Sequence, residues 1–459
     1  MRLVALFVLV VGLASAIDVR FSPARADGQA GVTTSAQPLR SGVDLVEIAA
    51  LVRDRDGRLV TDLAASDFQV IENGTPQIIA AFQRVSMPVR AVAGDAALFS
   101  SDVASNERAS DARVFILVLD ALHVASVRTR VVRDYARQFI ERHVGPADLV
   151  AVVSPGGLTA ATQDFTNDRP RLLAAVDQFA GSKMMSASVE IEQEKRALEA
   201  RSSSTPPSSR SAEPLHQGMD PSDGERATRV RALASVLQAL AAHLGRMQER
   251  RKALLLFSEG IDYDMLDVSG TLQRHSSDVM KAVNQAIGAL MRSNVSVYPI
   301  DPRALSSAEG DQVENPIYRE IPSVIQSSVE AEYSASIRGL RDIAESTGGF
   351  AAVDRNDIRP AFERIIEESS DYYILGYTPS KLAKPGESRT IDVRVSRPGT
   401  RVVARKGYVV AAAPARGFSS DTAAEPTFPT NVPCEGGPIG WISRRRRRRR
   451  GLRSVCQPN

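Results

Sequence analysis

Hydrophobic and polar positions divide the chain into three differently patterned stretches. Between residues 43 and 85, short apolar runs alternate with turn signals such as Asn73-Gly74, which favours β-hairpins. Residues 112–370 instead combine continuous apolar runs with helical spacings of apolar residues, which is typical of buried parallel strands joined by helices. Residues 371–410 return to strand patterns. The pattern therefore predicts an α/β fold class with β-rich flanks.

Both β-patterned flanks are short for an independent hydrophobic core. The simplest arrangement is one small β-sandwich built from residues 43–85 and 371–410, with the α/β domain inserted between its two halves. Residues 90–111 form a polar linker between the first flank and the α/β domain, which we place at residues 112–370. Within that domain, residues 184–228 are rich in Ser, Glu, Pro and Arg and predict an insertion that is partly helical at 188–200 and disordered after it.

The N-terminus has the pattern of a secretory signal. Residues 1–16 contain Arg2, a short apolar segment and the small residues Ala14-Ser15-Ala16, and an uncleaved anchor is the alternative interpretation. No later segment reaches the length of a membrane-spanning helix, so no transmembrane segment is expected after signal removal. The sequence predicts an exported protein, periplasmic or secreted, whose flexible lead-in covers residues 17–40.

Composition adds little to this picture, except at the C-terminus. The chain is 43% hydrophobic and 24% charged, which suits a globular protein. Seven arginines at residues 444–450 lie in a low-complexity tail at 411–459, and they produce the net charge of +3. The rest of the chain is mildly acidic, so no nucleic-acid partner is expected. Cys434 and Cys456, the two cysteines of the chain, also lie in the tail and could pair in an exported protein.

Carboxylates at predicted strand ends are the candidate chemistry. Asp120 ends the apolar run 114–119, and Glu259 follows the apolar run 253–257. Ligands of open α/β sheets bind outside the carboxyl ends of strands, so both carboxylates are expected near such a site. His123 could join them in a transition-metal site, and the alternatives are that it caps the next helix or faces solvent.

The same groups leave an enzymatic alternative open. Asp120, His123 and Glu259 could act with a metal in a hydrolase, where paired carboxylates serve general acid–base chemistry. The sequence has no G-x-S-x-G elbow, P-loop or H-E-x-x-H motif. We therefore assign no catalytic residue and predict a protein that is not an enzyme.

Several segments, taken together, resemble von Willebrand factor type A (VWA) domain proteins, and more closely the exported VWA-related proteins common in acidobacteria. The segments follow one another in a specific order and span about residues 43–410. They are residues 67–74, 114–120, 251–260, 297–301, 347–349, 372–379 and 405–408. The resemblance implies a doubly wound, mostly parallel six-stranded sheet with a metal-ion-dependent adhesion site at the carboxyl ends of its strands.

The resemblance also implies a set of metal ligands. Such a site takes a D-x-S-x-S loop, a threonine from a second loop and an aspartate from a T-D-G-like third loop, whose oxygens hold Mg²⁺. In this chain Asp120 is present, but Leu122 and Val124 replace both serines. Glu259 stands in the third loop, where Ser-Glu-Gly replaces the T-D-G pattern. Thr228, just before a helix predicted at 229–247, is the candidate for the middle ligand.

These observations lead to one function and two alternatives. We predict an adhesion-type module that binds a protein or cell-envelope partner, with a degenerate metal site for a divalent cation, Mg²⁺ or Mn²⁺. The candidate metal ligands are Asp120, Thr228, Glu259 and His123, with Thr166 as a weaker substitute for Thr228. The alternatives are the metal-dependent hydrolase and a structural envelope protein without a ligand.

Overall fold

The structure, a computed structural model, describes most of the chain between residues 45 and 410. It covers residues 45–87, 113–204, 220–247, 251–261, 263, 274–304, 323–381, 384 and 386–410. The predicted signal, lead-in and linker, the Arg-rich tail and both cysteines lie outside these residues. Within them, no helix combines the length and the apolar character that crossing a membrane requires.

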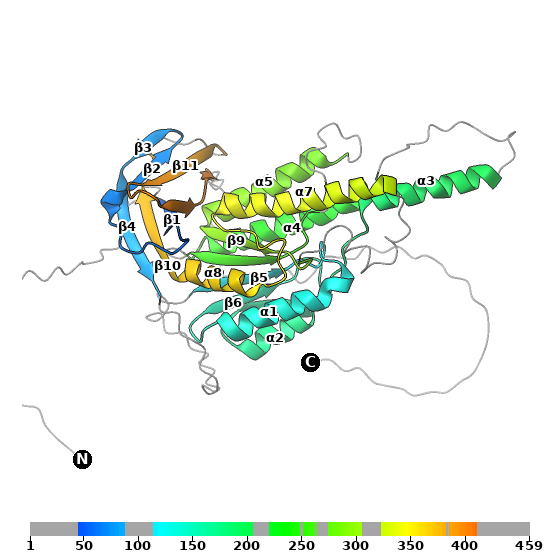
Figure 1. Cartoon of the computed structure of the whole chain (residues 1–459), viewed down its shortest axis with the longest axis horizontal. Helices are drawn as coiled ribbons and strands as arrows, with labels where there is room; N and C mark the ends of the chain where they lie inside the picture. The colour runs from blue at the N-terminus through cyan, green and yellow to red at the C-terminus, as the bar shows by residue number, and fades with distance from the viewer. Residues whose placement is uncertain are drawn as a thin grey trace, which may run out of the picture. The chain divides into compact units, whose positions relative to one another are not determined.

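A five-stranded sheet forms the centre of the α/β domain (Figure 1). Its order is β7-β6-β5-β8-β9, and all neighbouring pairs are parallel except β7 with β6. Every residue of β5, β8 and β9 is buried, because helices cover both faces of the sheet. The α/β prediction is thus confirmed. The strands are β5 (Val114–Leu119), β6 (Leu149–Val153), β7 (Gln163–Thr166), β8 (Lys252–Phe257) and β9 (Val295–Ile300).

The sheet differs from the predicted six strands at both edges. At one edge, the apolar residues 350–353 form no strand, and a single parallel bridge joins Ala352 to Ile300. At the other edge, the short strand β7 pairs antiparallel with β6. A sheet of six strands is therefore not confirmed by the part of the chain that the structure describes.

Helices cover both faces of the central sheet. One face buries Phe115, Leu117 and Leu119 against α1, α2 and α8, and the other buries Val114 and Ile116 against α4, α5 and α7. Helix α3 lies in the predicted insertion and contacts α7. The helices are α1 (Thr129–His143), α2 (Arg169–Asp177), α3 (Ala187–Ser204), α4 (Asp223–Leu244), α5 (Ser276–Arg292), α7 (Ser323–Thr347) and α8 (Arg359–Ser370). Short 3₁₀ helices lie at Ala65–Asp67, Ser126–Arg128 and Thr159–Ala161.

The two flanks interleave their strands in two antiparallel sheets. The first has the order β12-β1-β10-β4 and the second β13-β11-β2-β3, so each contains strands from both flanks. Ile48, Val70, Leu375 and Val393, which come from both sheets, share one apolar core. The strands are β1 (Val46–Arg53), β2 (Phe68–Glu72), β3 (Thr75–Gln77), β4 (Ile79–Ser86), β10 (Asp371–Tyr377), β11 (Ser388–Val395), β12 (Arg401–Ala404) and β13 (Gly407–Val409).

A buried polar network joins the sandwich to the amino-terminal ends of the parallel strands. The backbone N–H of Arg251, which precedes β8, donates to the Tyr372 hydroxyl at 3.1 Å. The Arg251 guanidinium donates to the Tyr298 hydroxyl at 2.9 Å, and Arg53 of β1 donates to the buried Glu368 at 3.1 Å. The sandwich is therefore fixed at one end of the sheet, and the opposite, carboxyl end of the strands is where the candidate site residues lie.

Candidate functional site

Asp120 lies fully buried directly after β5. Its backbone N–H donates to the carbonyl of Phe257, the last residue of β8, at 3.1 Å. Its carboxylate accepts hydrogen bonds from the Ser258 hydroxyl at 2.8 Å, from His123 Nδ1 at 2.9 Å, and from the backbone N–H of Leu122 at 3.2 Å. All these donors come from the Asp120 loop itself or from the neighbouring strand end. The carboxylate is therefore satisfied by groups of the protein.

His123 is a hydrogen-bond partner of Asp120, in line with the prediction that the two residues lie at one site, and it is only 2% exposed. Nδ1 of His123 lies 2.9 Å from Asp120 Oδ2, and in the tautomer that carries the proton on Nδ1 this N–H donates a hydrogen bond to the carboxylate. On a neutral ring, Nε2 is then an acceptor. Nε2 is buried and has no hydrogen-bond partner among the described residues. The idea that His123 faces solvent is wrong, because the ring lies in the interior.

Glu259 is a buried carboxylate surrounded by basic groups. Lys183 Nζ lies 3.2 Å from Oε2, and Arg128 Nη1 lies 3.4 Å from Oε1. The backbone N–H of Ala125 also donates to Oε1, at 2.7 Å. Burial raises the pKa of the Glu259 carboxyl, but Lys183, Arg128 and Arg303 together lower it more, to about 2. Glu259 is thus ionised at neutral pH because the protein supplies its counter-charges.

A third strand end repeats this arrangement. Asp301 follows β9, and the guanidinium of Arg303 binds its carboxylate with Nε and Nη2, at distances of 2.7–3.0 Å. Arg303 also donates to the Ser336 hydroxyl at 3.0 Å and stacks over the Tyr333 ring at 4.3 Å. Carboxylates therefore stand at the carboxyl ends of three adjacent strands. We call Asp120, His123, Arg128, Lys183, Ser258, Glu259, Asp301 and Arg303 the sheet-top cluster.

The predicted threonine ligands lie elsewhere. The helix expected to start after Thr228 begins earlier, at Asp223, so Thr228 lies inside α4. Its side chain is exposed, and its hydroxyl donates to the Gly224 carbonyl at 2.8 Å and accepts from Arg231 at 3.2 Å. Thr166 of β7 pairs with Val150, near the amino-terminal end of β6, so it lies toward the opposite edge of the sheet. The structure brings Asp120, His123 and Glu259 together, but it gives neither threonine a contact with them.

Apolar side chains occupy the positions of the two missing serines. Val124 is fully buried in the core that also contains Val132 and Phe139 of α1. Leu122 packs over Gly156, where a Cβ atom would come within 2.2 Å of the Leu122 side chain. The loop after β5 is thus fixed by packing at the positions where the resemblance implies hydroxyl ligands.

A divalent cation does not fit the carboxylates in this arrangement. Mg²⁺ needs several oxygen ligands that converge on one point. Here the oxygens of Asp120 face N–H and O–H donors, and those of Glu259 face an ammonium and a guanidinium group. No group of three or more His, Cys, Asp or Glu side chains that could hold a metal occurs among the residues that the structure describes. A cation would have to displace these partners before it could enter.

Sequence reasoning missed the basic members of the cluster. Arg128 and Lys183 were not singled out, and Asp301 with Arg303 was given no role. A signal existed for Asp301, because it follows the apolar run 295–300 as Asp120 follows the run 114–119.

In comparisons with known proteins, no family model and no curated protein matches this chain.

Proposed function

We propose that this chain is an exported, non-catalytic binding module of the VWA type, in which basic side chains of the protein replace the metal ion of the adhesion site. The observation that carries the proposal is the buried Glu259, which is bound by Lys183 and Arg128. The order of the central sheet, the helices on both of its faces and the position of Asp120 after β5 support the VWA part of the proposal.

In this proposal the sheet-top cluster acts by holding the surrounding loops in place. Glu259 binds the backbone of Ala125 in one loop and Lys183 in another. Backbone hydrogen bonds from Ser182 to the Ala121 carbonyl and from Lys183 to the Val124 carbonyl, at 2.7 and 3.0 Å, join the same two loops. Loops fixed before binding lose less conformational entropy when a partner docks. The partner, a protein or a cell-envelope component, would contact the outer surface of these loops.

Metal titration tests the replacement of the metal ion. Thermal unfolding of the exported chain is followed with Mg²⁺, Mn²⁺ or Zn²⁺ and with a chelator. A cation that binds only the folded protein, present at about 100 times its Kd, would stabilise it by about 2.7 kcal/mol. We expect no upward shift of Tm with any of the three ions. A clear upward shift that disappears in Asp120→Ala would overturn the proposal and establish a metal site.

The metal-dependent hydrolase remains a second candidate because of one observation. His123 pairs with Asp120 through Nδ1 and keeps Nε2 without a partner among the described residues, which is the pairing that a general base uses. The burial of His123 argues against it, because a substrate has to reach Nε2. Turnover of ester, phosphoester or peptide substrates that is abolished by a chelator and by His123→Ala would favour the hydrolase.

Cross-linking to envelope proteins separates the binding module from a structural protein without a ligand. We expect specific cross-linked species from the native chain and fewer from Glu259→Ala, because that variant releases the loops. Circular dichroism shows whether the variant is still folded. A chain that yields no cross-linked partner under any condition would instead be a structural component.

A further inference from the structure

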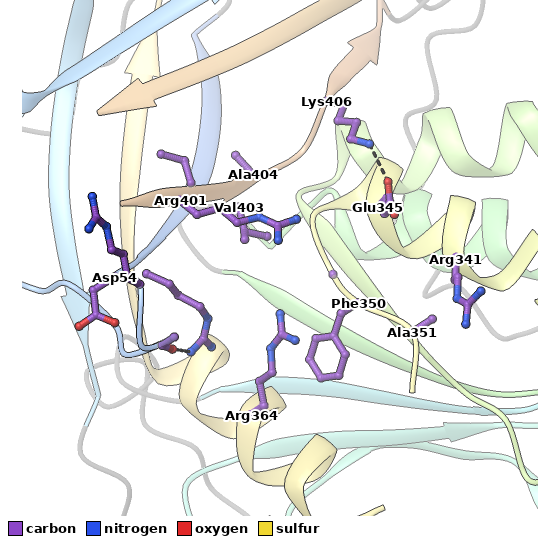
Figure 2. Close-up of a pocket in the computed structure, with 15 residues that line it drawn as sticks. Asp54, Arg341, Glu345, Phe350, Ala351, Arg364, Arg401, Val403, Ala404 and Lys406 are labelled. Atoms are coloured by element: carbon purple, nitrogen blue, oxygen red, sulfur yellow. Dashed lines mark hydrogen bonds and ion pairs between the residues drawn. The ribbon is translucent and has the colours of Figure 1, made fainter. Parts of the chain in front are cut away.

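We infer that a basic cleft between the β-sandwich and the α/β domain binds an extended acidic peptide segment. The cleft has a volume of about 670 Å³ and is lined by the turn after β1, by β12, by α7 and α8, and by residues 349–351 (Figure 2). None of its lining residues belongs to the sheet-top cluster. The inference therefore goes beyond the proposed function, and either one can fail without the other.

Positive charge exceeds negative charge in this cleft. Two carboxylates line it, Asp54 and Glu345. Six basic side chains line it, namely Arg53, Arg55, Arg341, Arg364, Arg401 and Lys406. Lys406 hydrogen-bonds Glu345 at 2.8 Å and, with a smaller contribution from Arg401, lowers the pKa of that carboxyl. Arg53, Arg341 and Arg364 are ion-paired with carboxylates just outside the lining, namely Glu367, Glu368 and Asp354. The positive charge that the cleft offers to an anionic ligand is therefore that of the remaining arginines, Arg55 and Arg401.

Two arginines of the cleft, Arg55 and Arg401, have guanidinium groups that make no hydrogen bond or ion pair with other described residues. Arg401 extends from β12 toward the middle of the cleft, and Arg364 rises from α8 on the other side (Figure 2). A guanidinium group presents paired N–H donors that match a carboxylate. Arg55 and Arg401 are therefore the groups that a carboxylate ligand would engage.

Arg364 is held ready in a fixed orientation. Its guanidinium lies 3.9 Å from the centre of the Phe350 ring, and its Nε donates to Glu368 at 2.8 Å. These contacts fix the plane of the group, so less side-chain entropy is lost when a ligand binds. The aromatic ring also gives the cleft an apolar wall for the non-charged part of a ligand.

The edge of a sheet supplies the backbone groups that a peptide needs. β12 is the edge strand of its sheet and pairs with β1. The Val52 carbonyl accepts from Val60, so the backbone groups of Val52 point away from β12. Because pairing alternates along antiparallel strands, the backbone groups of Val402, opposite Val52, point away from β1. An extended peptide can add to such an edge through main-chain hydrogen bonds.

The distribution of the charges favours a peptide over a small anion. The six basic side chains come from the end of β1 and the turn after it, from β12 and the residue pair that follows it, from α7 and from α8, so they surround the cleft instead of meeting at one point. Side chains of an extended peptide alternate, and every second one points to the same face. A segment with acidic residues at alternate positions would place carboxylates against Arg55 and Arg401, which have no ion pair with another described residue.

Fluorescence anisotropy tests the inference with a labelled peptide of alternating Glu and Val. We expect saturable binding to the full chain that weakens as the NaCl concentration rises, because charges at a surface are screened. The double variant Arg55→Glu/Arg401→Glu should weaken binding about tenfold or more. Arg58→Glu is the matched control, because Arg58 belongs to the same turn, is 78% exposed and does not line the cleft. It should change the Kd less than about twofold.

Two further peptides and two small anions make the result decisive. A peptide in which Gln replaces every Glu should bind much more weakly, and equal binding would overturn the electrostatic part of the inference. A peptide with proline at its centre should also bind more weakly, because proline removes a backbone donor. Inorganic phosphate or citrate that binds at lower concentration than the peptide would show a small-anion site instead. Absence of peptide binding to a chain that circular dichroism shows to be folded would overturn the inference.

Discussion

The sheet-top cluster and the cleft beside the sandwich use the same residue types in opposite ways. In the cluster, Asp120, Glu259 and Asp301 are buried, and each has a nitrogen partner within hydrogen-bonding distance. In the cleft, Arg55 and Arg401 are exposed and have no ion pair among the described residues. Buried charges need compensation because desolvation costs several kcal/mol per ion, whereas exposed charges remain hydrated.

This difference between paired, buried charges and unpaired, exposed charges indicates where a ligand can bind. A ligand at the sheet-top carboxylates would have to break bonds that the protein already makes. A ligand in the cleft would meet arginines whose donors face solvent and would replace only water. The cluster is therefore suited to holding loops in place, and the cleft to binding an anionic partner.

The largest expected effect is a loss of stability when Glu259 of the sheet-top cluster is removed. The comparison is with Glu345 of the cleft, because each of the two glutamates binds a lysine. Glu259→Ala removes a fully buried carboxylate that both the Lys183 ammonium and the Arg128 guanidinium contact, and these two side chains are only 18% and 6% exposed. We expect the free energy of unfolding, measured with urea, to fall by about 3–5 kcal/mol. Glu345→Ala is the matched control, since it removes the partner of Lys406 at a pair whose side chains are 62% and 66% exposed.

The control should change the free energy of unfolding by less than about 1 kcal/mol. Equal losses in the two variants would contradict the comparison, because they would mean that burial does not distinguish the two ion pairs. If Glu259→Ala does not fold, Glu259→Gln keeps the shape of the side chain and the hydrogen bond from Ala125. It should still lose more stability than Glu345→Gln.

Acid should remove the contribution of Glu259. Its pKa is lowered in the folded protein from 4.5 to about 2, so the ionised form stabilises the fold above pH 4.5 and this stabilisation decreases as the pH falls toward 2. The full contribution is about 3 kcal/mol, and about 2 kcal/mol of it should be lost by pH 3. The measurement is the difference in free energy of unfolding between the native protein and Glu259→Gln, from pH 7 to pH 3. A difference that stays constant over this range would contradict the assignment.

The buried strands were predictable because their apolar runs are unambiguous. A parallel strand covered on both faces contains few polar residues, as in β5 and β8. β7 was missed because Gln163–Thr166 is short, polar and only partly buried at an edge. The start of α4 was missed because Arg226 is charged. The structure buries this arginine against Asp220 at 2.8 Å, which a local pattern does not indicate.

The site was predictable in its carboxylates but not in their partners. Asp120 and Glu259 follow apolar runs, so their position at strand ends can be inferred from the chain. Lys183 and Arg128 lie 76 and 131 positions away from Glu259 in sequence, and only the folded loops bring them to it. The resemblance to a family implied a metal ion near Glu259, whereas the basic groups that contact Glu259 are brought to it by tertiary structure.

The smallest expected effect is a difference in stability between alanine variants of two glycines, one in each region. Gly260, next to Glu259, and Gly57, which lines the cleft, both have positive φ angles, of 93° and 81°. Alanine at either position is strained by about 1–2 kcal/mol. A Cβ atom at Gly260 would also lie 2.7 Å from the Ser336 carbonyl oxygen, whereas at Gly57 nothing lies within 4 Å. Urea unfolding should show that Gly260→Ala is more destabilising than Gly57→Ala by about 1–2 kcal/mol. Equal losses would mean that the sheet-top loops yield as easily as the exposed turn, and would weaken their assignment as a fixed binding surface.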